Sequence, residues 1–211
     1  MDLTIATYIK LAIIGLGILV GFSRQSSFSE ANRLFWLFLL VAFAGEILES
    51  LMSKYFRNNF PLYHVFRPLY FILLTLALSE EMGRFKKLFQ LTIPIVVIAA
   101  LLNGLFFQSP IKELNTVIIT LISIFLVLQV LFYIAILFEH YSWHETIYFH
   151  SFFICLGILI NSISSFLTLG VYNFLEGDGQ NSIILFLIIS EWIFYSSFIL
   201  NFVIQKKKPL Q

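Results

Sequence analysis

The sequence predicts an all-α protein that crosses a lipid bilayer as a bundle of about seven helices. Hydrophobic residues fill 59% of the 211 positions and charged residues only 12%, whereas a soluble domain has roughly 45–50% and about 25%. Apolar stretches also recur along the chain, each close to the ~20 residues that a helix needs to cross a hydrocarbon core. The excess apolar surface is therefore expected to face lipid, and the bilayer is the first partner that the sequence indicates.

Seven stretches of this length follow one another at about 4–22, 33–53, 61–79, 88–108, 115–138, 147–172 and 182–204. Polar or charged breaks separate them at 23–32, 54–60, 80–87, 109–114, 139–146 and 173–181. The stretches are continuously apolar, unlike the strands of a membrane barrel, which alternate over about ten residues, so helices are expected. Because no break is long enough to hold a folded domain, residues 1–211 are predicted to form a single seven-helix transmembrane domain.

The charges around these stretches bear on targeting and topology. The first stretch follows Asp2 instead of basic residues and lacks a small-residue cleavage pattern, so it is expected to remain as a helix. One side of the predicted bundle carries eight basic residues, namely Arg24, Arg33, Arg84, Lys86, Lys87, Lys206, Lys207 and Lys208. The other side carries about four, namely Lys10, Lys54, Arg57 and Lys112. Since basic loops favour the cytoplasm, we expect the N-terminus outside and the C-terminus inside.

Ionisable residues inside the predicted helices are the most informative, because each costs at least ~2.5–3.5 kcal/mol at the bilayer centre unless it is paired or hydrated. Glu46 and Glu49 lie in the second stretch, His64 and Arg67 in the third, and Glu191 in the last. The i, i+3 spacing places each of the first two pairs on one helix face. From their matching depths, we expect Glu46 to pair with Arg67. Glu49 is expected to pair with His64, nearer the outer surface.

Two amides, Asn103 and Asn161, lie at similar depth in the fourth and sixth stretches. Together with the ionisable residues they predict one outward-facing polar pocket, made of Glu46, Glu49, His64, Arg67, Asn103, Asn161 and Glu191. Glu191 has no expected cationic partner except Arg67, which favours a proton, ion or ligand role for this acid. The alternative is that the pairs and amides only hold the helices together, as many polar contacts between membrane helices do.

Other chemistry is weakly indicated. His140 and His144 have the i, i+4 spacing of a metal-binding pair, for which a third ligand such as His150 would be needed. Seven-helix metal hydrolases combine such a pair with an Asp inside the bundle, and no predicted span here contains Asp. Nucleotide, phosphate and nucleophile motifs are absent, and a net charge of +1 argues against nucleic acid. We predict no catalytic residue, metal or cofactor, and expect the lone Cys155 to serve packing.

The segment from Asn58 to Tyr70, NNFPLYHVFRPLY, resembles a motif of small, uncharacterised seven-helix integral membrane proteins of Bacteroidetes. Segments 129–138, 149–169 and 183–204 are similar to the last three helices of those proteins, so the resemblance covers most of the chain. The chain departs from their pattern at Tyr70, where a Glu is expected. The resemblance implies a seven-helix architecture in a bacterial inner membrane, and no particular activity.

These patterns favour a sensory or receptor-like membrane subunit, whose outer polar pocket recognises a small ligand or proton and acts through a cytoplasmic signalling partner. The alternative is a small-solute or proton-coupled transporter, in which Glu191 and the acids of the second helix carry a coupling proton or cation. A third hypothesis, an intramembrane metal hydrolase built on His140, His144 and His150, is the weakest of the three.

Overall fold

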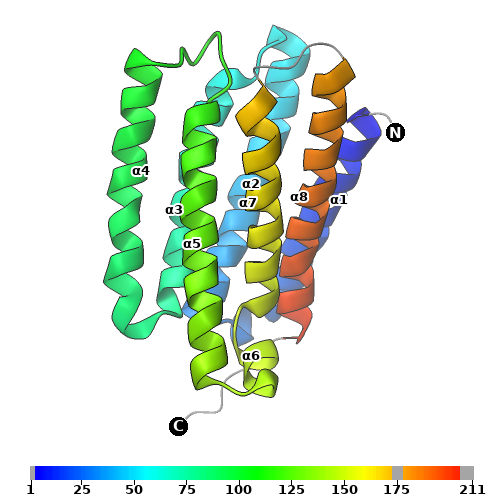
Figure 1. The fold of residues 1–211 in the computed structure, drawn as a ribbon. Coiled ribbons are helices and arrows are strands. Elements are labelled where there is room, and N and C mark those ends of the chain that lie inside the picture. Colours follow the sequence, from blue (N-terminus) through cyan, green and yellow to red (C-terminus); the bar gives the residue numbers. More distant parts are fainter. Residues whose placement is uncertain (1–2, 173–177, 205–211) are drawn as a thin grey trace.

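A computed structural model describes residues 3–172 and 178–204, and all of its long elements are helices (Figure 1). Seven of these helices are long and apolar enough to cross a membrane, which confirms the all-α seven-helix bundle. They are α1 (Leu3–Arg24), α2 (Glu30–Phe56), α3 (Phe60–Glu80), α4 (Lys86–Phe106), α5 (Thr116–His140), α7 (Phe152–Tyr172) and α8 (Asp178–Ile204). The short helix α6 (Trp143–Phe149) lies between α5 and α7.

The helix boundaries follow local sequence signals. The Ser29 side chain caps α2 by accepting a hydrogen bond from the backbone N–H of Asn32, and the left-handed Arg57 ends the same helix. Ser142 and Glu145 form a reciprocal capping box that starts α6. This capping box explains one difference from prediction. The sixth stretch was expected to begin at about 147, but residues 147–149 belong to α6, and α7 begins only at Phe152.

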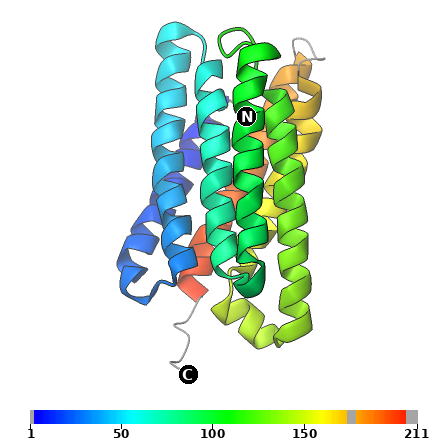
Figure 2. The same ribbon diagram turned by 90° about the vertical axis from the view of Figure 1, so that its left-hand side faces the viewer.

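Six of the long helices form a closed ring, and the seventh lies outside it. Around the ring, α1 packs on α2, α2 on α3, α3 on α5, α5 on α7, α7 on α8, and α8 returns to α1. Among the long helices, α4 makes its main contacts with α3 and α5, and Figure 2 shows it in front of that pair. The ring interior is therefore bounded by α1, α2, α3, α5, α7 and α8.

Two indole rings fasten α1 to its neighbours in this ring. Trp36 of α2 donates its Nε1–H to the Ile18 carbonyl, 3.0 Å away, and Trp192 of α8 donates to the Ala6 carbonyl at 3.1 Å. Both carbonyls belong to α1, so the first helix is held from two sides. Because a buried indole N–H needs a partner, these bonds fix how α2 and α8 face α1.

Aromatic side chains fill the ring interior toward the end where α8 finishes. Phe38 lies 5.4 Å from Phe198 between ring centroids, Phe198 lies 6.3 Å from Phe202, and Phe202 lies 4.8 Å from Phe28. Phe35 and Phe194 pack against the same set. We call these six phenylalanines the aromatic column. It reaches from the middle of the bundle to the connection between α1 and α2, which contains Phe28.

The first and last helices define the two ends of the bundle. The amino end contains Leu3, and the carboxyl end, opposite to it in Figure 1, contains Ile204. The lysines at 206–208, which contribute to the predicted orientation, lie outside the described residues. Lys10 does not belong to the loop charge at all, since it is only 6% exposed inside the bundle. Without Lys10, fewer basic residues remain in the loops at the amino end, so the difference in basic charge between the two ends is larger. This difference favours the amino end outside the cell.

Gly157 offers a test of the packing between α7 and α8. A Cβ atom at this position would lie 2.9 Å from the Ser197 Cβ and 3.2 Å from the Phe194 carbonyl oxygen, whereas one at Gly15 of α1 would meet nothing within 4 Å. We expect Gly157→Leu to lower the free energy of unfolding by about 1–3 kcal/mol through overpacking. Gly15→Leu, the matched control, should leave it unchanged or raise it slightly. Unfolding in mixed micelles, followed by circular dichroism, measures both, and equal effects would contradict the packing.

Candidate polar site

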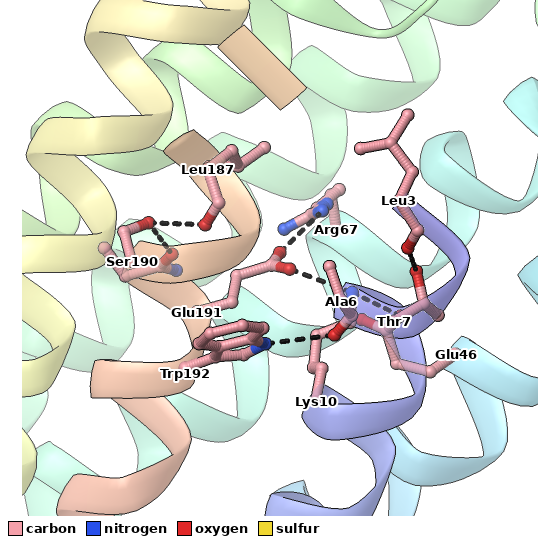
Figure 3. A network of polar contacts seen from close by, with 11 residues as sticks. Leu3, Ala6, Thr7, Lys10, Glu46, Arg67, Leu187, Ser190, Glu191 and Trp192 are labelled. Carbon is pink, nitrogen blue, oxygen red and sulfur yellow. Dashed lines mark hydrogen bonds and ion pairs between the residues drawn. The ribbon is translucent and has the colours of Figure 1, made fainter. Parts of the chain in front are cut away.

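Three ion pairs join four helices in the amino-end half of the ring. The Lys10 Nζ of α1 lies 2.6 Å from the Glu46 Oε2 of α2 and 2.9 Å from the Glu191 Oε2 of α8. The other carboxylate oxygen of Glu191, Oε1, lies 3.6 Å from the Arg67 Nη2 of α3. Figure 3 shows Glu191 between the two cations. We call these four residues the ion-pair network.

The side chains of the ion-pair network are largely buried. The side chains of Lys10, Glu46 and Glu191 are 8%, 6% and 5% exposed, and that of Arg67 is 14% exposed. Charges in such surroundings persist only when they are paired and hydrogen-bonded, because desolvation otherwise costs several kcal/mol per ion. The network therefore constrains how α1, α2, α3 and α8 can pack.

A large cavity runs from the amino end down to this network. Its volume is about 790 Å³, and residues of α1, α2, α3, α7 and α8 line it. Lys10, Glu46 and Glu191 lie at its floor, and Leu3, Lys54 and Phe60 are among the residues near its mouth. On α2, Glu46, Glu49, Ser50 and Ser53 all line the cavity, as their i, i+3, i+4 and i+7 spacing allows. The cavity gives the network access from the amino end.

A smaller chamber of about 50 Å³ lies on the inner side of Glu191. Arg67, Asn161 and Ser165 line it together with aromatic residues that include Phe38 and Phe194. The Arg67 Nε and the Tyr70 hydroxyl are buried there and have no hydrogen-bond partner. Glu191 thus lies between the large cavity and the small chamber, and the aromatic column fills the space beyond.

The seven predicted pocket residues have different positions in the structure. Glu46, Glu49 and Glu191 line the cavity, while Arg67, Asn161 and Glu191 line the inner chamber. The predicted partners differ from the observed ones, because Glu46 pairs with Lys10 and Arg67 pairs with Glu191. Lys10 was missing from the prediction because a lysine eight residues into an apolar stretch resembles one that extends to the surface.

His64 and Asn103 lie outside the cavity. The His64 Nε2 is 3.2 Å from the Glu113 carbonyl oxygen in the loop before α5, so this ring faces the loop instead of Glu49. Asn103 donates to the side chains of Gln108 and Asn115 at 3.0 and 2.9 Å. Because α4 lies outside the helix ring, Asn103 cannot reach the ring interior, and it serves to fold the connection between α4 and α5.

A second buried polar cluster lies at the carboxyl end, where the sequence suggested only loops. Glu81, which ends α3, accepts hydrogen bonds from the Ser151 backbone N–H at 3.1 Å, the Ser151 hydroxyl at 2.5 Å and the Tyr133 hydroxyl. The His150 Nδ1 lies 3.5 Å from the same carboxylate. Burial alone would raise the pKa of Glu81, but His150 and the hydrogen bonds outweigh it and lower that pKa from its ordinary value. The cluster fastens α3 to α5 and to the joint between α6 and α7.

The histidines considered for a metal are separated by their surroundings. His140 and His144 are exposed, whereas His150 is buried and packs on the Tyr141 ring at 4.3 Å between centroids. Over the described residues, no three His, Cys, Asp or Glu side chains are arranged to hold a metal ion. The structure therefore adds nothing in favour of the metal hydrolase hypothesis.

Comparison with protein-family models, curated proteins and solved structures finds no match to this chain. The class of protein that the fold and site define is a seven-helix membrane bundle with a buried ion-pair network beneath an open cavity.

Removing Lys10 tests the ion-pair network. We expect Lys10→Met to lower the free energy of unfolding by about 3–5 kcal/mol, because it leaves Glu46 and Glu191 buried without this cation. Lys54→Met, at the exposed cavity mouth, is the matched control and should change it by less than ~0.5 kcal/mol. The double variant Lys10→Met/Glu46→Gln should lose less than the sum of its single variants. Strict additivity in mixed-micelle unfolding would show that the two residues do not interact.

The carboxyl-end cluster predicts a pH dependence of stability. Since the pKa of Glu81 is lower in the folded protein than in the unfolded chain, its contribution is complete above the ordinary value of 4.5. That contribution is lost as the pH falls through the lowered folded-state pKa. The difference in unfolding free energy between the native chain and Glu81→Gln should therefore shrink in acid.

Glu80→Gln is the control for this measurement, because Glu80 forms an ion pair with Lys86, whose side chain is 42% exposed. Such exposed pairs contribute only about 0–1 kcal/mol. A constant difference between the native chain and Glu81→Gln from pH 7 to pH 3 would refute the role of the Glu81 carboxylate.

Proposed function

We propose that this protein is a sensory or receptor-like subunit of a bacterial inner membrane, which binds a small ligand in the cavity at its amino end. The observation that carries the proposal is that the cavity floor is the ion-pair network itself. A ligand that competes for one of these charges alters a contact between helices, and so its binding energy can change how α1, α2, α3 and α8 pack. The proposal places the cavity outside the cell, as the charge of the loops favours.

The aromatic column supplies a contiguous path from the site toward the other end. Phe38 lines the inner chamber and packs on Tyr70, which follows Arg67 by one helical turn. From Phe38 the ring contacts continue through Phe198 and Phe202 to Phe28, in the connection between α1 and α2. Close-packed side chains have little room for small adjustments, so a displacement at one end is transmitted when they switch from one packing to another. A cytoplasmic signalling partner would read the result at the carboxyl end.

The same column argues against an open transport route in this conformation. The polar residues below the chamber bond to one another. Gln129 accepts a hydrogen bond from the Thr75 hydroxyl at 3.2 Å and donates one to the Thr92 hydroxyl at 2.9 Å, so these groups are already satisfied. A small-solute or proton-coupled transporter stays the second candidate, because Glu191 is shared by the cavity and the chamber. Proton flux into proteoliposomes that is abolished by Glu191→Gln would select this candidate.

Blocking the cavity tests the receptor function. Cys155 is the single cysteine and is fully buried, so a Cys155→Ala chain gives a background for Ser50→Cys on the cavity wall. A bulky maleimide attached there should disturb the ion-pair network. We expect hydrogen exchange of residues 24–30, at the carboxyl end, to change by about threefold or more in lipid nanodiscs.

The same maleimide on Ser109→Cys is the matched control. Ser109 lies in the loop between α4 and α5 at the amino end and does not line the cavity. This label should alter exchange only in its own loop. If the Ser50→Cys label also changes exchange only at the amino end, the proposed coupling between the two ends is wrong.

A further inference from the structure

Glu49 is a buried acid that faces the cavity without a partner. It is 6% exposed and lines the cavity wall one helical turn above Glu46. Within residues 3–172 and 178–204, no hydrogen bond or ion pair reaches its carboxylate. Buried carboxylates are normally paired or hydrogen-bonded, because an isolated one loses its hydration without compensation. The Glu49 oxygens are not among the fully enclosed atoms without a partner, so they open onto the cavity. The cavity wall therefore presents an acceptor that no donor among the described residues occupies.

The charged residues around Glu49 include more acids than cations. The described residues at the cavity floor and inner chamber supply three carboxylates, Glu46, Glu49 and Glu191, and two cations, Lys10 and Arg67. Both cations already belong to the ion-pair network. Lys54 lies near the mouth, where its Nζ is 5.8 Å from the centroid of the Tyr55 ring. Among the described residues, Glu49 is thus the carboxylate of this set that no cation contacts.

The size and walls of the cavity indicate what kind of cation suits Glu49. A volume of about 790 Å³ falls in the range of small-molecule sites, roughly 300–1,000 Å³, and is far larger than a metal ion requires. Leu51, Phe60, Leu187 and Ile188 form part of its walls, and they offer apolar surface above the acids. The Tyr63 ring, whose residue also lines the cavity, already covers the Arg67 guanidinium at 5.0 Å. The site therefore suits a cationic group attached to a hydrocarbon body.

We infer that the cavity binds an organic molecule through an ammonium group that pairs with Glu49, while its hydrocarbon part lies against the leucine and isoleucine side chains. The inference rests on the proposed receptor function and adds the chemical class of the ligand. Two sources supply such a group, a water-soluble amine and the headgroup of an aminophospholipid. An ammonium group bound at Glu49, one helical turn above Glu46, would lie next to the ion-pair network and compete with Lys10 for its carboxylates.

The charge selectivity of the cavity can be measured without a known ligand. In the Cys155→Ala background, Ser50→Cys is treated in vesicles with a cationic methanethiosulfonate reagent and with its anionic counterpart. Because Ser50 is adjacent to Glu49, the cationic reagent should react about tenfold faster or more, after normalisation to the rates at Ser109→Cys. Glu49→Gln should remove most of this preference. Glu49→Asp should keep this preference, which would show that the preference depends on the charge of residue 49 and not on the shape of its side chain.

The second test is whether a ligand protects the cysteine at position 50 from the reagent. Butylammonium should slow modification of Ser50→Cys in a saturable way, whereas butanol of the same size should not, and Glu49→Gln should abolish the protection. Replacing phosphatidylglycerol vesicles by vesicles that contain phosphatidylethanolamine tests the lipid source. Slower modification in those vesicles, dependent on Glu49, identifies the headgroup, and protection by butylammonium alone identifies a soluble amine.

Equal selectivity in the native and Glu49→Gln cavities, with no protection by butylammonium or phosphatidylethanolamine, would overturn the inference. That result is distinguishable from failure of the receptor function. The exchange experiment with the maleimide depends on coupling between the two ends and not on the charge of any ligand.

Discussion

The structure depends on one constraint, the placement of charges inside the bundle, where they lose most of their hydration. Lys10 satisfies it by bridging Glu46 and Glu191, and Arg67 completes the set from the other side of Glu191. Each of the four residues comes from a different helix, so the charges can be neutralised only in one arrangement of α1, α2, α3 and α8. Apolar contacts between membrane helices specify packing weakly, because lipid tails are as apolar as leucine. The network provides the specificity that these contacts lack.

The same arrangement would couple ligand binding in the cavity to the packing of the helices. A cavity whose floor were apolar could fill and empty without disturbing the bundle, but here the floor consists of the contacts that hold four helices together. Beyond them the aromatic column leaves little room for a gradual response, since close-packed interiors change by switching between packings. The carboxyl-end cluster at Glu81 fastens α3 to α5 and to the joint between α6 and α7. A change in the ion-pair network would therefore act on the packing of α1, α2, α3 and α8, while these carboxyl-end contacts stay in place.

The sequence was sufficient to predict the helices and the burial of Glu46, Glu49 and Glu191, because hydrophobic length and burial cost act locally, but it counted the buried Lys10 among the loop charges. It could not predict the partners. Glu46 and Arg67 match in depth, yet Lys10 is the residue that contacts Glu46 in the ring. Which helices are neighbours in the ring cannot be read from the spacing of residues along a single helix. Asn103 was misplaced for the same reason, since nothing in its stretch shows that α4 lies outside the ring. Glu80 and Glu81 are adjacent acids of one turn, and only the fold distinguishes the exposed one from the buried one.

The closure of the ring by its first and last helices has a consequence for biosynthesis. Lys10 and Glu191 are 181 residues apart, so at roughly 5–20 residues per second the ribosome needs about 9–36 s to supply the partner after the lysine has been made. During this interval the Lys10 ammonium group lacks Glu191, and its long side chain can extend toward the nearer end of α1. In the complete bundle the same group lies 2.9 Å from the Glu191 Oε2. A nascent chain truncated before α8 is therefore expected to keep Lys10 more accessible than the full chain does.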